Sequence, residues 1–174
     1  WDKVGTVDED GNIYFFTYLF MRFMDDDLIT FSSQKVSIFP KERIAERYGL
    51  SGHHPIFITV GEIKHRKGQL DTLRALVLLR REYPHFLYLM VGGAGDRAYV
   101  DTVMQYADEH KVRDCVRIIE GASDADLAAL YAASDVFCLN SRSDGEHFEG
   151  FGLVFLEAAQ CGVPGIGSRG SGIE

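Results

Sequence analysis

The sequence is poor in cysteine, has no excess of basic residues and contains no apolar run long enough to cross a membrane. Its three cysteines are an odd number in apolar surroundings, which predicts buried, reduced thiols and argues against a disulfide scaffold. Its formal net charge of -8 disfavours general nucleic-acid binding, which needs a basic stripe. The strongest apolar run, Ile13 to Met24, is too short to span a bilayer, and Arg22 interrupts it.

What remains is typical of a globular domain with a real core. The chain has 174 residues, of which 46% are apolar and 25% charged. It begins at Trp1, shows no signal peptide and ends in a glycine-rich stretch that resembles an interrupted loop. We therefore expect further sequence at both ends and a cytoplasmic location. We assign residues 1–52 to a linker or remnant of an N-terminal domain plus a lead-in helix, and residues 53–174 to a C-terminally truncated Rossmann-like domain.

The first part of the chain differs from the rest in its aromatic content. Ile13 to Met24 predicts a buried strand or helix from a neighbouring domain, and peripheral attachment to the inner face of a membrane is the alternative. The acids Asp25 to Asp27 follow this run. A solvated turn is the preferred interpretation of these acids. The alternative is the metal-binding acid motif of the GT-A glycosyltransferase fold.

From residue 53 onward, short apolar runs alternate with amphipathic segments. This alternation predicts βαβ units, hence an α/β fold with a parallel sheet, helices on both faces and ligands at the carboxyl ends of the strands. The predicted strands are 55–60, 86–91, 115–119, 136–140 and one beginning at 163. The predicted helices are 41–50, 69–83, 96–110, 123–133 and 151–161, with Asp96 as an N-cap and Pro84 as a stop.

One carboxylate stands in the apolar helix predicted over 151–161. Glu157 is the only charge of this helix, and a buried carboxylate needs a partner. That partner is either a structural hydrogen bond or basic side chain of the protein, or the hydroxyl groups of a ligand. Glu149 precedes it by eight residues, about 12 Å along a helix. Gly150 and Gly152 leave N–H groups open at the helix N-terminus, where an anion is favoured.

A small basic cluster also stands out against the acidic composition. Lys64, Arg66 and Lys67 follow the glycine that ends the first strand of the alternating pattern, Gly61. The next strand ends in a second glycine turn, Gly92 to Gly95. Both turns are predicted at the carboxyl edge of the sheet, where the cations could neutralise an anionic ligand.

These segments together resemble a known family. The stretch EGFGLVFLEAAQCGVPGIGSRGSGIE is similar to the signature of retaining GT-B glycosyltransferases of the family-4 type, with seven residues, among them Gly-Phe-Gly, between two glutamates. The resemblance covers about residues 48 to 174, in the family's order and spacing. The upstream elements that match are Gly61 with Arg66 to Gly68, Val91 to Gly95, Gly121, Asp126 with Leu127, Tyr131, Ser134 to Phe137 and Ser141.

The resemblance implies that this domain binds a nucleoside-diphosphate sugar, with UDP- or GDP-sugar as substrate and without a cofactor or metal. Lys67 and Arg66 would neutralise the diphosphate, a task that a metal ion performs elsewhere. Glu149 would hold hydroxyls of the transferred sugar, together with the N–H groups of Phe151 and Gly152. Glu149, Lys67 and Arg66 are therefore the predicted catalytic residues.

The resemblance further implies that Glu157 holds the ribose and that the base lies near Ile119 to Gly121. The acceptor would be a glycan, a lipid or a small molecule, attacking on the face that the diphosphate leaves. The N-terminal domain of the same protein would supply the acceptor site. The predicted donor-binding residues are Gly61, Lys67, Gly93, Glu120, Gly121, Glu149, Gly150, Phe151, Gly152, Leu153 and Glu157.

The chain departs from the family pattern at two places. The family has arginine directly after the first glycine, whereas this chain has Glu62, which would repel phosphate unless it is turned away or paired, for example with Lys64. The family's paired glycines are split in Gly170 to Gly172. The acidic loop before the signature contains His147, which a substrate could touch, although a solvated histidine is more common.

Other functions are also compatible with parts of the sequence. Gly93-x-Gly95-x-x-Ala98, followed by Glu120 after the next strand, is a passable dinucleotide fingerprint, so an NAD(P)-binding oxidoreductase is the alternative enzyme class. However, this fingerprint normally follows the first strand. The chain could also be a donor-binding fragment with no activity alone, or part of a sugar phosphorylase or nucleotide-sugar epimerase.

Overall fold

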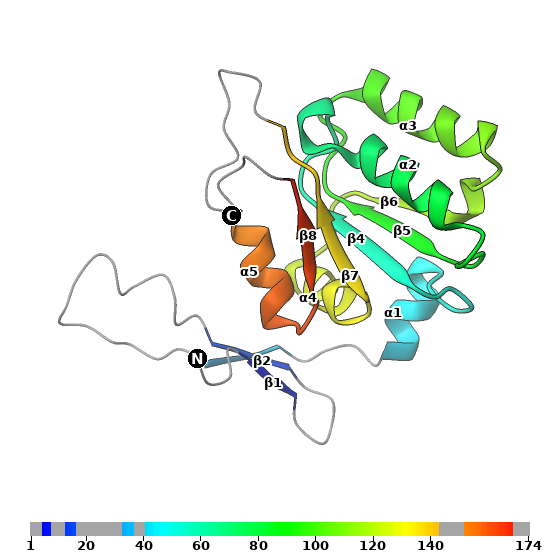
Figure 1. Cartoon of the computed structure of the whole chain (residues 1–174). Helices are drawn as coiled ribbons and strands as arrows, with labels where there is room; N and C mark the ends of the chain where they lie inside the picture. The colour runs from blue at the N-terminus through cyan, green and yellow to red at the C-terminus, as the bar shows by residue number, and fades with distance from the viewer. Residues whose placement is uncertain (1–4, 8–12, 17–32, 37–40, 143–151, 169–174) are drawn as a thin grey trace.

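The computed structural model describes residues 5–7, 13–16, 33–36, 41–142 and 152–168 (Figure 1). Three short strands near the N-terminus pair antiparallel in the order β1-β2-β3. Ile13–Phe16 is thus a strand, one of the two forms expected for the aromatic run, whereas the rest of that run and Asp25 to Asp27 lie outside the described residues. The three strands are β1 (Gly5–Val7), β2 (Ile13–Phe16) and β3 (Ser33–Val36).

A five-stranded parallel sheet forms the centre of the main domain. Its order is β6-β5-β4-β7-β8, and every neighbouring pair is parallel, as the alternating pattern predicts. From β4 the chain adds β5 and then β6 on one side of the sheet, and it then crosses back to add β7 and β8 on the other side of β4. The strand order therefore reverses between β4 and β7, which is called the reversal point below. The strands are β4 (Ile56–Val60), β5 (Leu87–Val91), β6 (Val116–Ile119), β7 (Val136–Leu139) and β8 (Gly165–Gly167).

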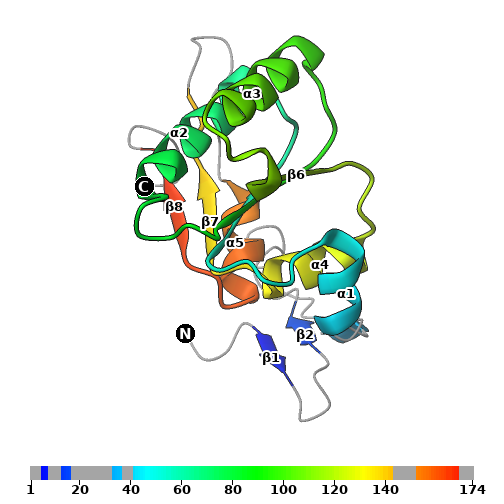
Figure 2. The ribbon, with the colours of Figure 1, turned by 90° about the vertical axis from the view of Figure 1, so that its right-hand side faces the viewer.

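Helices cover both faces of this sheet, which confirms the predicted α/β class. Helices α2 and α3 lie on one face, and α1, α4 and α5 lie on the other (Figure 2). The predicted N-cap is confirmed, because the Asp96 side chain accepts a hydrogen bond from the Tyr99 N–H. The helices are α1 (Lys41–Tyr48), α2 (Gln69–Leu79), α3 (Arg97–Glu109), α4 (Asp124–Ala132) and α5 (Leu153–Gln160), with short 3-10 turns η1 (His65–Lys67) and η2 (Arg113–Cys115).

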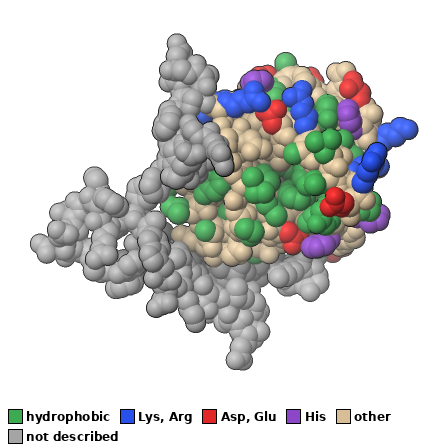
Figure 3. All heavy atoms as spheres, in the orientation of Figure 1, with side chains coloured by type: hydrophobic (Ala, Val, Ile, Leu, Met, Phe, Trp, Pro, Cys, Tyr) green, Lys and Arg blue, Asp and Glu red, His purple; other side chains and the backbone are tan. Residues whose placement is uncertain are grey.

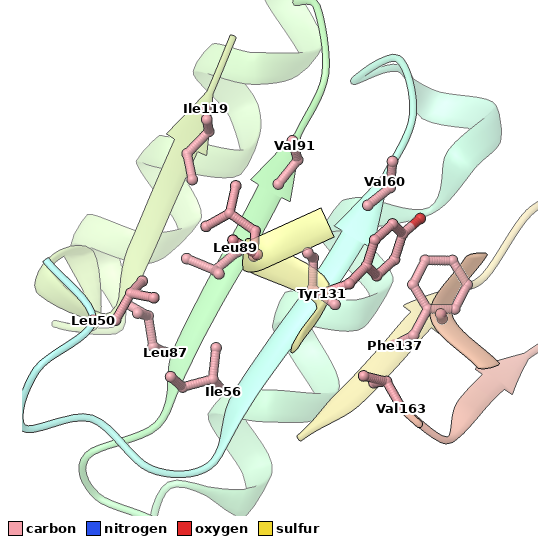
Figure 4. Close-up of a cluster of buried hydrophobic side chains, with 14 of the residues drawn as sticks. Leu50, Ile56, Val60, Leu87, Leu89, Val91, Ile119, Tyr131, Phe137 and Val163 are labelled. Carbon is pink, nitrogen blue, oxygen red and sulfur yellow. The ribbon is translucent and has the colours of Figure 1, made fainter. Parts of the chain in front are cut away.

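Alternation along the strands divides the core into two parts. Ile56, Ile58 and Val60 pack toward α1, α4 and α5, whereas Phe57 packs toward α2 and α3. Figure 4 shows side chains of the first group on neighbouring strands. All three cysteines are free thiols, as predicted, but only Cys138 is buried, whereas Cys115 and Cys161 are half-buried. Burial raises the pKa of Cys138 to about 12.

Two helices differ from their predictions. Helix α2 ends at Leu79 rather than Tyr83, because its apolar face no longer meets the sheet there: Leu78 is 81% exposed and Leu79 39%. The sequence predicts an apolar helix over 151–161, whereas the described part of α5 begins at Leu153 and only Ala158 is fully buried in it. This helix lies beside the edge strand β8, so among the described elements it packs mainly against α4 and β8.

Candidate donor-binding site

The loops that carry the predicted site all leave the carboxyl ends of the parallel strands. In open α/β sheets a ligand binds in the crevice outside these ends, where the strand order reverses. Here that point lies between β4 and β7. Figure 3 shows Lys and Arg side chains in the upper part of the visible face, and others at its right-hand edge.

The two glycine turns pack directly on each other. The Ile63 N–H donates to the Gly93 carbonyl at 2.9 Å, and the Asp96 N–H donates back to the Ile63 carbonyl at 3.3 Å. Gly92 has φ 150°, and a Cβ there would clash with the carbonyl group of Gly61, 2.6 Å from its carbon. The structure therefore brings the turns of Gly61 and Gly93 together and requires glycine at position 92.

Glu62, the departure from the family pattern, is paired within its own loop. Lys64 donates a hydrogen bond through Nζ to the Glu62 carboxylate, as expected for an acid that would otherwise repel phosphate. The carboxylate lies across Gly95, where an added Cβ would come within 2.5 Å of Glu62 Cδ. The charge of Glu62 is thus opposed by Lys64, and its side chain is directed toward the second glycine turn.

The cations Arg66 and Lys67 lie in η1, between the end of β4 and the start of α2. Both side chains are half-buried. The Lys67 stem lies over Gly61, with Cε 3.8 Å from the position that a Cβ would take there. Gly68 follows with φ 70°, a left-handed conformation that turns the chain into α2. The structure therefore places Lys67 beside Gly61, as the predicted diphosphate site requires.

The loop after β7 is fastened to this basic turn. The Arg142 N–H donates to the Arg66 carbonyl at 2.8 Å, and the Arg142 guanidinium pairs with Asp71 of α2 at 2.8 Å. The Asn140 amide donates to the Thr72 hydroxyl at 2.9 Å. These contacts cross the point where the strand order reverses, so they determine how the β7 loop is placed relative to Arg66 and Lys67.

Glu120, expected near the base, links two loops of the same edge. Its carboxylate accepts hydrogen bonds from the Ala94 N–H at 3.2 Å and from Arg97 at 3.3 Å. Gly121 follows in the left-handed conformation with φ 68°, and it is open to solvent, as is Gly93. The side chain of Glu120 is thus engaged with the protein, and the Ile119 carbonyl accepts from the Gly92 N–H, so the exposed backbone of this segment is that of Glu120 and Gly121.

Glu157 is half-buried on α5 and meets a hydroxyl group rather than a cation. The Tyr131 hydroxyl donates to Glu157 Oε2 at 3.0 Å and lies 3.4 Å from the Val154 carbonyl. Within the described residues no lysine or arginine pairs with Glu157. Of the two structural partners considered for Glu157, the hydrogen bond within the protein is therefore observed, whereas an ion pair with a basic side chain is not seen in this part of the chain.

Several predicted site residues lie outside the described residues. Glu149, Gly150, Phe151 and His147 are among them, together with the split glycines after residue 168. The described helix covers only the second half of the interval between the two glutamates, so their separation of about 12 Å stays a prediction. Gly152 is the N-cap of α5 with φ 59°, and Leu153, the first helical residue, is exposed.

The described residues contain no group of three His, Cys, Asp or Glu side chains that could hold a metal ion. No helix among the described residues is both long enough and apolar enough to cross a membrane.

A doubly wound parallel sheet, with glycine turns and a basic turn at its carboxyl edge, defines a Rossmann-like domain of the kind found in GT-B glycosyltransferases. The family model described as "Glycosyl transferases group 1" matches residues 40–174, so the chain belongs to that family.

Relatives and solved structures agree with this assignment. A GDP-mannose-dependent alpha-(1-6)-phosphatidylinositol monomannoside mannosyltransferase of Mycolicibacterium smegmatis is 37% identical over 134 residues, 76% of this chain and 34% of the relative. A glycogen synthase of Mycobacterium tuberculosis is 33% identical over 114 residues, 66% of this chain and 26% of the relative. The chain thus spans about a third or less of these relatives.

Among solved structures, HepE of Anabaena in complex with UDP and glucose aligns with a TM-score of 0.65 at 22% identity. The alignment covers 76% of this chain and 34% of that protein. A glycosyltransferase of Rickettsia africae aligns with a TM-score of 0.66 at 24% identity, covering 78% and 35% of the two chains. At these identities the likeness supports the fold alone.

The oxidoreductase alternative is not favoured. The fingerprint glycines follow β5, the second strand of the main sheet, rather than the central strand β4. The Glu62 side chain covers Gly95, and the Glu120 carboxylate is held by Ala94 and Arg97, so neither is free for a dinucleotide. The family match over residues 40–174 accounts for the same glycines.

Three contacts of the site were not anticipated from sequence. They are the hydrogen bond from Tyr131 to Glu157, the pair of Arg97 with Glu120, and the attachment of the β7 loop to the basic turn. Tyr131 was identified only as an element of the family pattern. No local sequence signal links it to Glu157, because they lie 26 positions apart on different helices.

Proposed function

We propose that this chain is the donor-binding part of a retaining, metal-independent glycosyltransferase of the family-4 type. It would bind a nucleoside-diphosphate sugar whose sugar passes to a hydroxyl of a glycan, lipid or small molecule. Because the chain spans about a third of its relatives, the acceptor site and the transfer itself would need the N-terminal domain of the same protein. Alone, the chain would bind donor without transferring sugar.

The observation that carries the proposal is the state of Glu157. It is the only charge on an otherwise apolar helix, its hydrogen-bond partner is a neutral hydroxyl, and no basic side chain of the described residues neutralises it. A half-buried carboxylate in that state is suited to accept hydrogen bonds from ligand hydroxyls. The ribose of a sugar nucleotide supplies two.

The basic turn formed by Arg66 and Lys67 supports the proposed diphosphate site. Arg66 and Lys67 lie beside the glycine turns at the reversal point, where a diphosphate would meet fixed positive charge without a metal ion. Glu149 and the N–H groups near Gly152 would hold the transferred sugar, and the backbone near Gly121 would contact the base. A cytoplasmic location, peripheral to the inner face of a membrane when the acceptor is a lipid, belongs to the same proposal.

A binding screen tests the proposed function. UDP-, GDP- and ADP-sugars are titrated into the chain by calorimetry, with NADH as the competing ligand class. The name of the M. smegmatis relative makes GDP-mannose the first donor to try. Binding of at least one nucleotide sugar and none of NADH is expected. Binding of NADH alone, or of no nucleotide, would reject the proposal.

Glu157→Ala is expected to weaken nucleotide binding by about 1–3 kcal/mol, because hydrogen bonds to a charged acceptor are lost. The measurement is the change in Kd for the nucleotide that binds best. Because Glu157 is half-buried and solvated on one side, the fold should tolerate the change. Unchanged affinity in a folded variant would make Glu157 a structural residue only.

Lys67→Ala is expected to reduce affinity for the nucleoside diphosphate far more than for the parent nucleoside, because only the former carries charge at the basic turn. Arg81→Ala is the control, since this exposed cation follows the opposite end of α2 from the basic turn. Titrations of both ligands into both variants give the comparison. Equal losses for the diphosphate and the nucleoside would contradict the role of Lys67.

A further inference from the structure

The Tyr131 hydroxyl lies in the protein interior at the back of the proposed ribose site. Tyr131 is 2% exposed, and its ring packs against Phe137 at 6.1 Å between centroids; Phe137 in turn meets Phe155 edge-on at 4.8 Å. In Figure 4 the ring lies beside Val60 and Phe137, with its oxygen directed toward the carboxyl end of β4. Such packing on both sides leaves the ring little freedom, so the hydroxyl has a fixed position.

The hydroxyl has one proton, and the carboxylate can only accept it. The Tyr131 hydroxyl donates to Glu157 Oε2 at 3.0 Å, whereas the Val154 carbonyl is more distant at 3.4 Å. Burial, and then the charge of Glu157, raises the pKa of Tyr131, so the donor proton is retained at neutral pH. In the described residues Glu157 Oε1 has no hydrogen-bond partner. One carboxylate oxygen is therefore held and the other is left for a ligand.

We propose that Tyr131 is a positioning residue that orients the Glu157 carboxylate toward the ribose diol and thereby sets the preference for ribonucleotides over deoxyribonucleotides. This inference rests on the proposed function. An unheld glutamate would sample several rotamers, and ordering it would cost part of the energy of each ribose hydrogen bond. The hydrogen bond from Tyr131 removes that cost before the ligand arrives.

The test is selectivity rather than affinity alone. Tyr131→Phe removes only the hydroxyl, and the chain is titrated with the best-binding nucleoside diphosphate and with its 2′,3′-dideoxy analogue. We expect a loss of about tenfold for the ribonucleotide, the size of one charge-assisted hydrogen bond, and little change for the analogue. The ratio of the ribonucleotide affinity to the analogue affinity should therefore fall by about tenfold.

Tyr88→Phe is the matched control. Tyr88 is equally buried, its hydroxyl meets the Thr59 hydroxyl at 2.8 Å, and it lies on the opposite face of the sheet. Tyr88→Phe should lower the free energy of unfolding in denaturant as Tyr131→Phe does, yet it should leave the preference for the ribonucleotide unchanged. A second measurement combines Tyr131→Phe with Glu157→Gln. We expect the effect of the tyrosine on the ratio to shrink there, since the charged acceptor is gone.

The outcomes separate the two proposals. If the unmodified chain binds no nucleotide, the proposed function fails and this inference with it. If it binds and Glu157→Ala weakens binding, but Tyr131→Phe lowers both affinities equally or neither, only the positioning role is overturned. A shift of the ratio in Tyr88→Phe as large as in Tyr131→Phe would also overturn it.

Discussion

Gly68→Ala is expected to destabilise the domain by about 2–5 kcal/mol and to disturb the basic turn. Gly68 has φ 70°, where an L-residue costs about 1–2 kcal/mol. Its Cβ would also collide with the Asn140 carbonyl group, 2.9 Å from the carbon, and overpacking against backbone adds about 1–3 kcal/mol. Because Gly68 follows Lys67 and Asn140 opens the β7 loop, the strain would fall on both sides of the proposed diphosphate site.

Gly162→Ala separates these two causes. Gly162 has φ 73°, nearly the same conformation, but a Cβ there would meet nothing within 4 Å. Its loss of stability in urea should therefore be about 1–2 kcal/mol, the conformational cost alone. Equal losses for the two variants would mean that the β7 loop moves freely away from Gly68.

Phe137→Ala is expected to cost about 3–5 kcal/mol of folding free energy, enough to unfold a large fraction of a marginally stable domain. The side chain is 0% exposed in β7 and lies between the rings of Tyr131 and Phe155. Its removal leaves a cavity that the parallel strands on either side cannot close, so the transfer and cavity terms add. Thermal and urea unfolding give the measurement.

Leu78→Ala is the control for this prediction. Leu78 is 81% exposed on α2, and a truncation there should change stability by less than about 0.5 kcal/mol. A small effect at Phe137 would show that the aromatic cluster does not hold α4, α5 and β7 together. It would also weaken the case that the Tyr131 ring is fixed, since the same ring packs against Phe137.

The proposed site combines loops at the carboxyl edge of the sheet with the carboxylate of Glu157. The loops after β4, β5 and β6 are joined by Ile63, Gly93 and Glu120 through hydrogen bonds at the carboxyl edge. The β7 loop is attached to these loops through Arg142. The carboxylate of Glu157 comes from α5 and is oriented from α4, on the other face of the sheet. A sugar nucleotide bound across the reversal point would contact both these loops and Glu157.

The sequence alone determined much of this protein. Alternating apolar runs and amphipathic segments specify a parallel sheet with helices on both faces, because such strands can bury both faces only under crossover helices. It also located Gly61, Lys67 and Gly93 at one edge, since all follow strands. The pairing of Glu62 with Lys64 could be anticipated because the two residues lie close in the chain.

Which distant residues meet follows from the three-dimensional packing and not from local sequence. The order β6-β5-β4-β7-β8 places Asn140 against Gly68, and the packing of α4 on α5 places the Tyr131 hydroxyl on Glu157. Periodicity reports which face of an element is buried, but not which neighbour covers it. Those neighbours follow from strand order and helix packing, which depend on the whole chain, and they determine whether a half-buried carboxylate meets a cation or a hydroxyl group.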